Sequence, residues 1–320
     1  MAGGPNSNPT VVILTALFAN LVIAIAKFGA FWFTRSASML AEAFHSVADT
    51  GNQILMYIGL KRADKPADET HPYGYGKETY FWSFVVAISI FTVGAAFSFY
   101  EGTHKIIEVL HGTAAPVQDQ TVGYIVLSIS LLVEGYAFYV AMREFRRNDP
   151  DRTMREAIAA NRAAAVVTVL FEDLAAVGGL CVALLGALLA DITGNPLYDA
   201  IATLCIGVIL AVVAVFLAFM TKRLLIGQSA SPDVEKKIEE AIHTVEGVVN
   251  ILELKTLHMG ENYILLNLGI QFQAGMTTQD LEQTIDRIEV SVKKASPTVQ
   301  RIFIEVDSFR SGPNAGLDAG

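Results

Sequence analysis

The stretch SMLAEAFHSVADTGNQILMYIGL, residues 38–60, decides how this chain folds. Its 23 residues are enough to cross a bilayer, since a helix that rises about 1.5 Å per residue spans a hydrocarbon core of ~30 Å in about 20 residues. His45 and Asp49 are one helical turn apart and share a face, and Glu42 lies three residues before His45 on that face. Ionisable side chains at membrane depth are costly and mark ion or proton pathways. The stretch therefore predicts a membrane helix whose ionisable residues belong to an ion or proton pathway.

The rest of the chain has the composition of a membrane protein. Hydrophobic residues make up 52% of the 320 residues and charged residues only 17%, which is less charge than soluble proteins of this length carry. Six apolar stretches are each long enough to span a bilayer, so we expect six transmembrane helices. They run over 11–33, 38–60, 80–100, 122–142, 163–190 and 197–221.

The loops between these stretches predict the orientation. Basic residues concentrate after the second and fourth stretches, whereas the opposite loops carry only Arg35 and Lys105. The positive-inside rule then places both termini and the basic loops in the cytoplasm. We expect the inner membrane of a bacterium, and the sequence leaves an organelle membrane open. The basic loop residues are Lys61, Arg62, Lys65, Lys77, Arg143, Arg146, Arg147, Arg152 and Arg155.

After Arg223 the pattern becomes that of a small water-soluble domain. Ser231 followed by Pro232, and Thr277 followed by Asp280, predict the starts of two helices with apolar stripes. Alternating apolar residues predict strands at 251–258, 264–272 and 301–307. The order αββαβ predicts an α+β domain with both helices on one side of a three-stranded sheet. We therefore divide the chain into a cytoplasmic tail at 1–9, a six-helix transmembrane domain at 10–225, a cytoplasmic α+β domain at 229–310, to which the resemblance described below assigns dimerisation, and a disordered tail at 311–320.

A second pair of acidic residues, Glu172 and Asp173, lies within the fifth stretch. Asp173 is ten residues into it, and is therefore about 15 Å deep. Helices that supply inward carboxylates and imidazoles form metal sites inside bundles, and such donors suit Zn²⁺, Mn²⁺ or Fe²⁺. We predict a transport site for a divalent cation that contains His45, Asp49 and Asp173. His45 is the expected proton carrier, because imidazole titrates near physiological pH.

Three motifs carry a resemblance to a known family. Residues 38–49, SMLAEAFHSVAD, and residues 71–77, HPYGYGK, are similar to signatures of the cation diffusion facilitator family, while LFEDLAAV at 170–177 resembles its zinc transporter nine branch. The resemblance covers nearly the whole chain. It implies six spans, a ferredoxin-like cytoplasmic domain and a homodimer. It also implies export of divalent metal, Zn²⁺ first and Mn²⁺ or Fe²⁺ as alternatives, in exchange for protons by alternating access, with no prosthetic group and no nucleic-acid partner.

The resemblance also assigns individual residues. His45, Asp49 and Asp173 match three of the family's four transport ligands, and the fourth position holds Val169. Glu172, Glu42 or a water molecule are the candidates for the missing ligand. In the loop, Asp68 and His71 match two ligands of a possible second site whose third position is Tyr75. Among the other polar residues within spans, Lys27 is expected to snorkel or pair across helices, and Glu134 and Asp199 to line a vestibule or to bond a neighbouring helix.

Two other classes of function stay open. One is a non-transporting, metal-responsive membrane scaffold or regulator. The other is a membrane-bound, metal-dependent hydrolase, although the sequence has no HExxH helix, Ser/His/Asp set or phosphate loop to support it. We therefore expect a transporter that is not an enzyme.

Overall fold

The computed structural model describes residues 9–34, 37–113, 121–148 and 164–306, with the side chains of 30–31, 33–34, 37–45 and 148 left out. The chain divides into two compact units, residues 1–223 and 224–320. Each unit is described by itself below. The predicted tail at 311–320 lies outside the described residues, as does most of the tail at 1–9.

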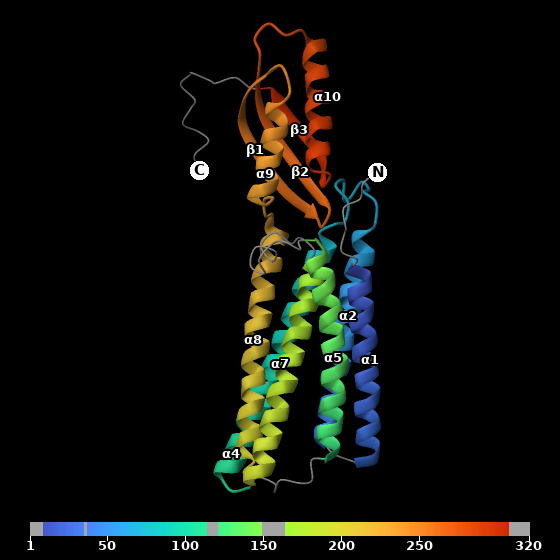
Figure 1. Cartoon of the computed structure of the whole chain (residues 1–320), viewed down its shortest axis with the longest axis vertical. Coiled ribbons are helices and arrows are strands. Elements are labelled where there is room, and N and C mark those ends of the chain that lie inside the picture. The colour runs from blue at the N-terminus through green and yellow to red at the C-terminus, as the bar shows by residue number, and fades with distance from the viewer. Residues whose placement is uncertain (1–8, 35–36, 114–120, 149–163, 307–320) are drawn as a thin grey trace. The chain divides into compact units, whose positions relative to one another are not determined.

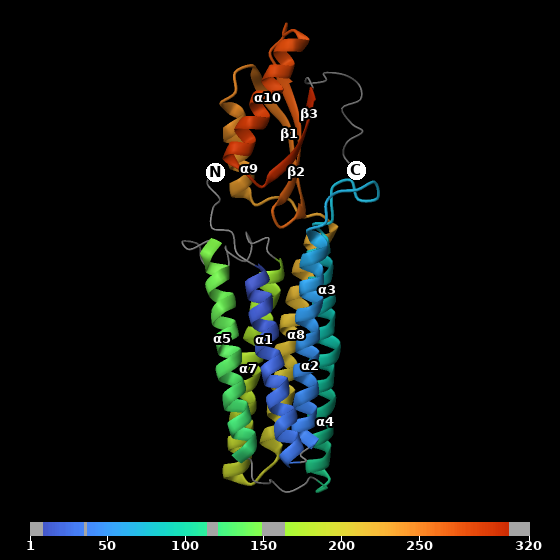
Figure 2. The same ribbon diagram turned by 90° about the vertical axis from the view of Figure 1, so that its right-hand side faces the viewer.

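The first unit is a bundle of long helices that run alongside one another (Figures 1 and 2). All six apolar stretches are helical within their described parts, and the third contains a π-helical turn, η1, between two α-helical pieces. Five segments are long and apolar enough to cross a membrane: α1, α3 to α4, α5, α7 and α8. The bounds are α1 (Pro9–Thr34), α2 (Ala37–Ala63), α3 (Glu78–Ser89), η1 (Ile90–Ala95), α4 (Ala96–Leu110), α5 (Thr121–Asn148), α7 (Ala164–Thr193) and α8 (Leu197–Ile226).

The remaining helix of the bundle, α2, is about as long as the others but more polar. Its 27 residues include Asp49, Asn52 and Gln53 near the middle, which keep it out of the strongly apolar group. It packs against α1 and α3. A helix of this kind is stable in a membrane when its polar face is turned toward its neighbours.

The bundle is apolar outside and partly polar inside, the reverse of a water-soluble domain. Large hydrophobic side chains such as Leu132 and Phe219 are exposed to the extent of 76% and 64%. Buried polar side chains gather in the interior instead. They include Asn20, Lys27, Ser46, Asn52, Gln53, Glu134, Glu172 and Asp173. This distribution suits lipid surroundings, and with the span lengths it confirms the predicted multi-pass helical membrane architecture.

Glycine allows α7 and α8 to approach closely. A Cβ atom added at Gly186 would overlap the Cβ of Ala202 and lie 3.2 Å from the carbonyl oxygen of Tyr198. Small residues at such crossings let helix backbones pack in membranes, where van der Waals contact drives association.

The variant Gly186→Ala is therefore expected to be less stable than the parent, by about 1–3 kcal/mol, because the new methyl group must push two backbones apart. Thermal unfolding in detergent, followed by tryptophan fluorescence, measures the effect. Gly178→Ala is the matched control on the same helix, since nothing lies within 4 Å of an added Cβ there. Equal unfolding temperatures for the two variants would contradict the packing argument.

The elements of the second unit follow the order αββαβ, which confirms the prediction from the sequence. The sheet order is β1-β2-β3, with β1 and β2 antiparallel and β2 and β3 parallel. The parallel pair requires a crossover, which α10 supplies. The bounds are α9 (Pro232–His243), β1 (Val248–Gly260), β2 (Tyr263–Phe272), α10 (Thr278–Ala295) and β3 (Val299–Val306).

Alternation along β2 builds the core of this unit. Ile264, Leu266, Leu268 and Ile270 are all buried, and they belong to one cluster with residues of α9 and α10. Both helices therefore cover the same face of the sheet, as Figure 2 shows. The predicted capping box at Thr277 is present, with reciprocal bonds of 3.2 Å between the side chain and backbone of Thr277 and Asp280. The side chain of Ser231, by contrast, makes no capping bond.

Candidate functional site

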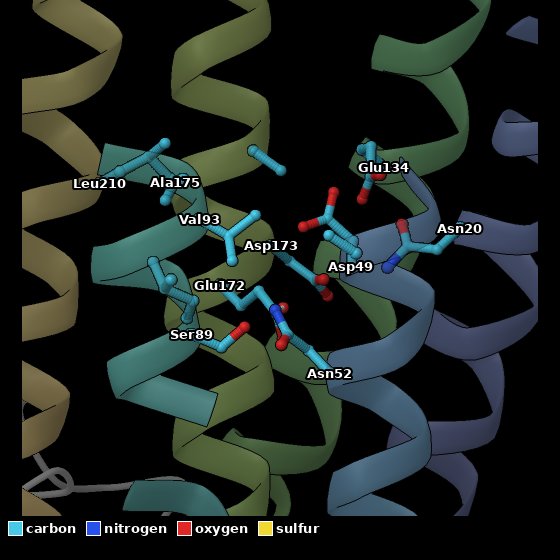
Figure 3. Close-up of a pocket in the computed structure, with 14 residues that line it drawn as sticks. Asn20, Asp49, Asn52, Ser89, Val93, Glu134, Glu172, Asp173, Ala175 and Leu210 are labelled. Carbon is cyan, nitrogen blue, oxygen red and sulfur yellow. Dashed lines mark hydrogen bonds between the residues drawn. The ribbon is translucent and has the colours of Figure 1, made fainter. Parts of the chain in front are cut away.

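A small cavity lies inside the helix bundle, where polar side chains from several helices meet (Figure 3). Its volume is about 40 Å³, which is room for roughly three water molecules at 10–15 Å³ each. Its polar lining comes from α1, α2, α3, α5 and α7, and includes Asn20, Asp49, Asn52, Ser89, Glu134, Glu172 and Asp173. The π-helical turn contributes Ile90, Val93 and Gly94. Such turns occur often at functional sites.

Two of the predicted cation ligands line this cavity from different helices. Asp49 comes from α2 and Asp173 from α7 (Figure 3). Asp173 is only 2% exposed, and its Oδ2 atom accepts no hydrogen bond from the part of the chain that is described. A buried carboxylate oxygen without a donor is costly. A cation that enters the cavity would satisfy it.

The other predicted ligands are less directly visible. His45 and Glu42 lie on the described backbone of α2, but their side chains are among those left out. Among the described side chains, no three His, Cys, Asp or Glu groups are close enough to hold one ion. The described side chains thus do not include every predicted ligand, and those that are described do not enclose an ion.

Glu172 lines the same cavity, and two amide groups hold it there. Asn52 Nδ2 donates to its Oε1 over 3.0 Å, and Gln53 Nε2 donates to its Oε2 over 2.6 Å. These bonds join α7 to α2 and fix the helix that carries Asp173. Sequence reasoning did not pair Glu172 with Asn52, although polar residues three and four positions after Asp49 in an apolar span were a usable signal.

Three other charged residues of the spans, Lys27, Glu134 and Asp199, bear on the alternatives that the sequence left open. Lys27 is 4% exposed and donates to Ser46 Oγ over 3.0 Å, so it pairs across helices and does not snorkel. Glu134 lines the cavity. Asp199 instead bonds a neighbouring helix, through an ion pair with Lys105 of 3.2 Å.

Comparison with known proteins adds to this geometry. Residues 13–226 match the cation efflux transmembrane domain, and residues 230–309 match the cation efflux protein cytoplasmic domain. This chain belongs to the cation efflux family. The resemblance stated from the sequence motifs is thereby confirmed. The expectation that the protein is not an enzyme is also confirmed, because the family is one of transporters.

Individual relatives of this chain differ in length. The proton-coupled zinc antiporter SLC30A9, mitochondrial, of Mus musculus is 29% identical over 93% of this chain and 59% of the relative. Metal tolerance protein C4 of Arabidopsis thaliana is 30% identical over 87% of this chain and 60% of the relative. This chain thus spans about three fifths of these two proteins. The cation-efflux pump FieF of Escherichia fergusonii is 26% identical over 86% of this chain and 87% of the relative.

The loop between α2 and α3 contains the second predicted site, and here Asp68 organises a turn. It accepts hydrogen bonds from Thr70 N, Thr70 Oγ1 and His71 N at 2.8–2.9 Å, and from the Tyr75 hydroxyl at 2.7 Å. The His71 ring stacks on Tyr75. These bonds, the Tyr75 hydroxyl foremost, lower the pKa of Asp68 from 3.8 to about 2. The contacts favour a structural turn, and a loop metal site stays a prediction.

Replacing Tyr75 by phenylalanine is expected to raise the pKa of Asp68 toward 3.8, because the largest stabiliser of its ionised form is lost. Since the folded pKa is depressed, the carboxylate stabilises the turn fully above pH 3.8 and ceases to do so as the pH falls through about 2. Carbon-13 NMR titration of the aspartate side chains measures the shift. Tyr73→Phe in the same loop is the control. A zinc-dependent shift of the Asp68 signal at neutral pH would instead support a metal site.

Proposed function

We propose that this protein exports a divalent cation from the cytoplasm in exchange for protons. The observation that carries the proposal is the buried Asp173 carboxylate, with one oxygen open toward a cavity that Asp49 also lines. The names of the relatives support it, since one is a proton-coupled zinc antiporter and another a cation-efflux pump.

The coupling follows from the chemistry of the ligands. Carboxylates and imidazole bind metal only in their deprotonated forms, so a cation and protons compete for Asp49, Asp173 and His45. A proton gradient directed inward then displaces the cation outward. The charges of Asp49, Glu134 and Glu172 all act on Asp173, so in the absence of a cation these groups repel one another. Cation entry removes that repulsion, and alternating access releases the cation on the other side.

We propose Zn²⁺ as the first substrate, with Mn²⁺ and Fe²⁺ as alternatives. His45 supplies the nitrogen donor that zinc favours, while the carboxylates of Asp49 and Asp173 accept harder ions as well. Glu172 and Glu42 stay candidate ligands. Glu172 would have to exchange two amide donors to bind a metal directly, so the contacts favour a positioning role for it. The cation is cargo, and the proposal includes no prosthetic group.

The experiment that tests the proposal is a flux assay in proteoliposomes with a pH-sensitive dye inside. Zn²⁺, Mn²⁺, Fe²⁺ and Co²⁺ are added singly and then in competition. Metal-dependent proton movement that scales with a preformed pH gradient is the expected result. A scaffold or regulator, the second candidate, would bind metal through the same buried carboxylates without moving protons.

We further propose the assembly and the orientation. The second unit matches a cytoplasmic domain of the family, which supports its placement in the cytoplasm and a role in homodimer formation. The basic loops support cytoplasmic termini. A bacterial inner membrane stays our expectation, and the curated relatives include mitochondrial proteins.

A further inference from the structure

We propose that Glu134 of α5 is a cation-binding residue of the transport site and biases it toward harder divalent ions. The inference rests on the proposed function and adds to it a third ligand-bearing helix. Its starting point is the position one turn before Asp173, where Val169 is fully buried and has no donor atom to offer a metal.

The surroundings of Glu134 point to a ligand. Its side chain is 6% exposed and lines the same cavity as Asp49 and Asp173. Figure 3 shows these three carboxylates approaching one another from α5, α2 and α7. Within the described part of the chain, Glu134 makes no hydrogen bond or ion pair. A glutamate retained in the membrane only to bond a neighbouring helix would be expected to make such a contact.

A second, independent observation concerns the opposite wall of the cavity. Asp173 Oδ2 has no donor among the described atoms, and Asp173 and Glu134 line the same cavity from two helices. Glu172 provides the contrast, because amide groups satisfy both of its oxygens. Among the described side chains, the interior thus holds one carboxylate with both oxygens bonded, Glu172, and one, Asp173, with an oxygen that has no donor.

The carboxylates of Asp49, Glu134 and Asp173 do not surround an ion in this structure, since no three described acidic groups lie within reach of one metal. Like charges in a poorly screened interior repel, and Asp49 acts on Glu134 in this way. The opposing charge of Lys27 also acts on Glu134. A glutamate has more rotatable bonds than an aspartate, so Glu134 can swing toward Asp49 and Asp173 when a cation offsets the repulsion.

The chemical consequence is selectivity. A third carboxylate makes the donor set richer in oxygen, which suits Mn²⁺ or Fe²⁺ better than a nitrogen-rich set does. Glu134 should therefore contribute more to the binding of Mn²⁺ than of Zn²⁺. Replacement by histidine should reverse this bias, because imidazole is a better ligand for zinc than for manganese.

The test measures Mn²⁺ and Zn²⁺ binding to the full-length protein in detergent by titration calorimetry. Glu134→Gln is expected to weaken Mn²⁺ binding about 10- to 100-fold and Zn²⁺ binding less, and Glu134→His to favour Zn²⁺ over Mn²⁺ relative to Glu134→Gln. The control is Glu144→Gln on the same helix, where the carboxylate lies 3.6 Å from Arg147, and it should bind both ions like the parent. Glu134→Asp keeps the charge and remains informative if the neutral variant does not fold, since its shorter side chain should still weaken Mn²⁺ binding.

Parent-like affinities for both ions in the folded Glu134 variants would overturn the inference. If Asp173→Asn still lost binding in that case, the proposed function would stand without Glu134. If Asp173→Asn also bound like the parent, the transport site itself would be wrongly placed.

Discussion

Replacing Asp173 by asparagine is expected to abolish metal-dependent proton flux and yet leave the metal-free protein at least as stable as the parent. Asparagine has nearly the same shape, but it neither carries the charge that holds a cation nor exchanges a proton with it. The parent keeps a buried carboxylate with an open oxygen at this position. Replacing this carboxylate by a neutral amide removes its repulsion with the neighbouring carboxylates. Residues kept for function commonly lower the stability of the folded protein in this way.

Two measurements on the same preparation check this result: proton flux in proteoliposomes, and thermal unfolding with and without Zn²⁺. Zinc should raise the unfolding temperature of the parent by mass action and should not raise that of the variant. Asp191→Asn, at the exposed end of the same helix, is the control and should resemble the parent in both assays. Normal flux in Asp173→Asn and in the corresponding Asp49→Asn variant would refute the site.

Replacing Glu172 by alanine is expected to have the opposite profile, with a clear loss of stability. Asn52 and Gln53 would each keep a buried amide group without its acceptor, at about 1–3 kcal/mol per group. The loss of the link between α2 and α7 should also lower transport, because Asp49 and Asp173 would no longer be held in register. Thermal unfolding of the metal-free protein measures the first effect.

A double-mutant cycle tests whether the bond itself is responsible. Glu172→Ala combined with Gln53→Ala should destabilise the protein by less than the sum of the single changes, because the second change removes a group that the first has already left unbonded. Strict additivity would show that Glu172 acts in some other way.

The sequence predicted the order of elements well, because the signals that specify it are local. A long apolar stretch is sufficient to indicate a membrane helix, and the alternation through Ile264 and Leu266 is sufficient to indicate a strand with one buried face. Asp49 and Asp173 could be named as candidate site residues for the same reason, since a carboxylate within an apolar span is visible in the sequence alone.

The partners of these residues were harder to predict. Whether Glu134 faces the cavity, or Asn52 reaches Glu172, depends on how each helix is rotated about its own axis. A helix in lipid is apolar on nearly all sides, so its sequence has no strong polar stripe from which to read that rotation. The π-helical turn at 90–95 likewise leaves no sequence mark, although it brings Val93 to the cavity.

The pair of bonds from Glu172 to Asn52 and Gln53 has a mechanical consequence. Since the bonds lie beside the cavity, they couple α2 and α7 at the level of Asp49 and Asp173. The two helices would then move as one unit, and the spacing between Asp49 and Asp173 would stay constant. In the proposed transport cycle, access to the cavity would then change through movement of the neighbouring helices, while Asp49 and Asp173 both stay in contact with the cation.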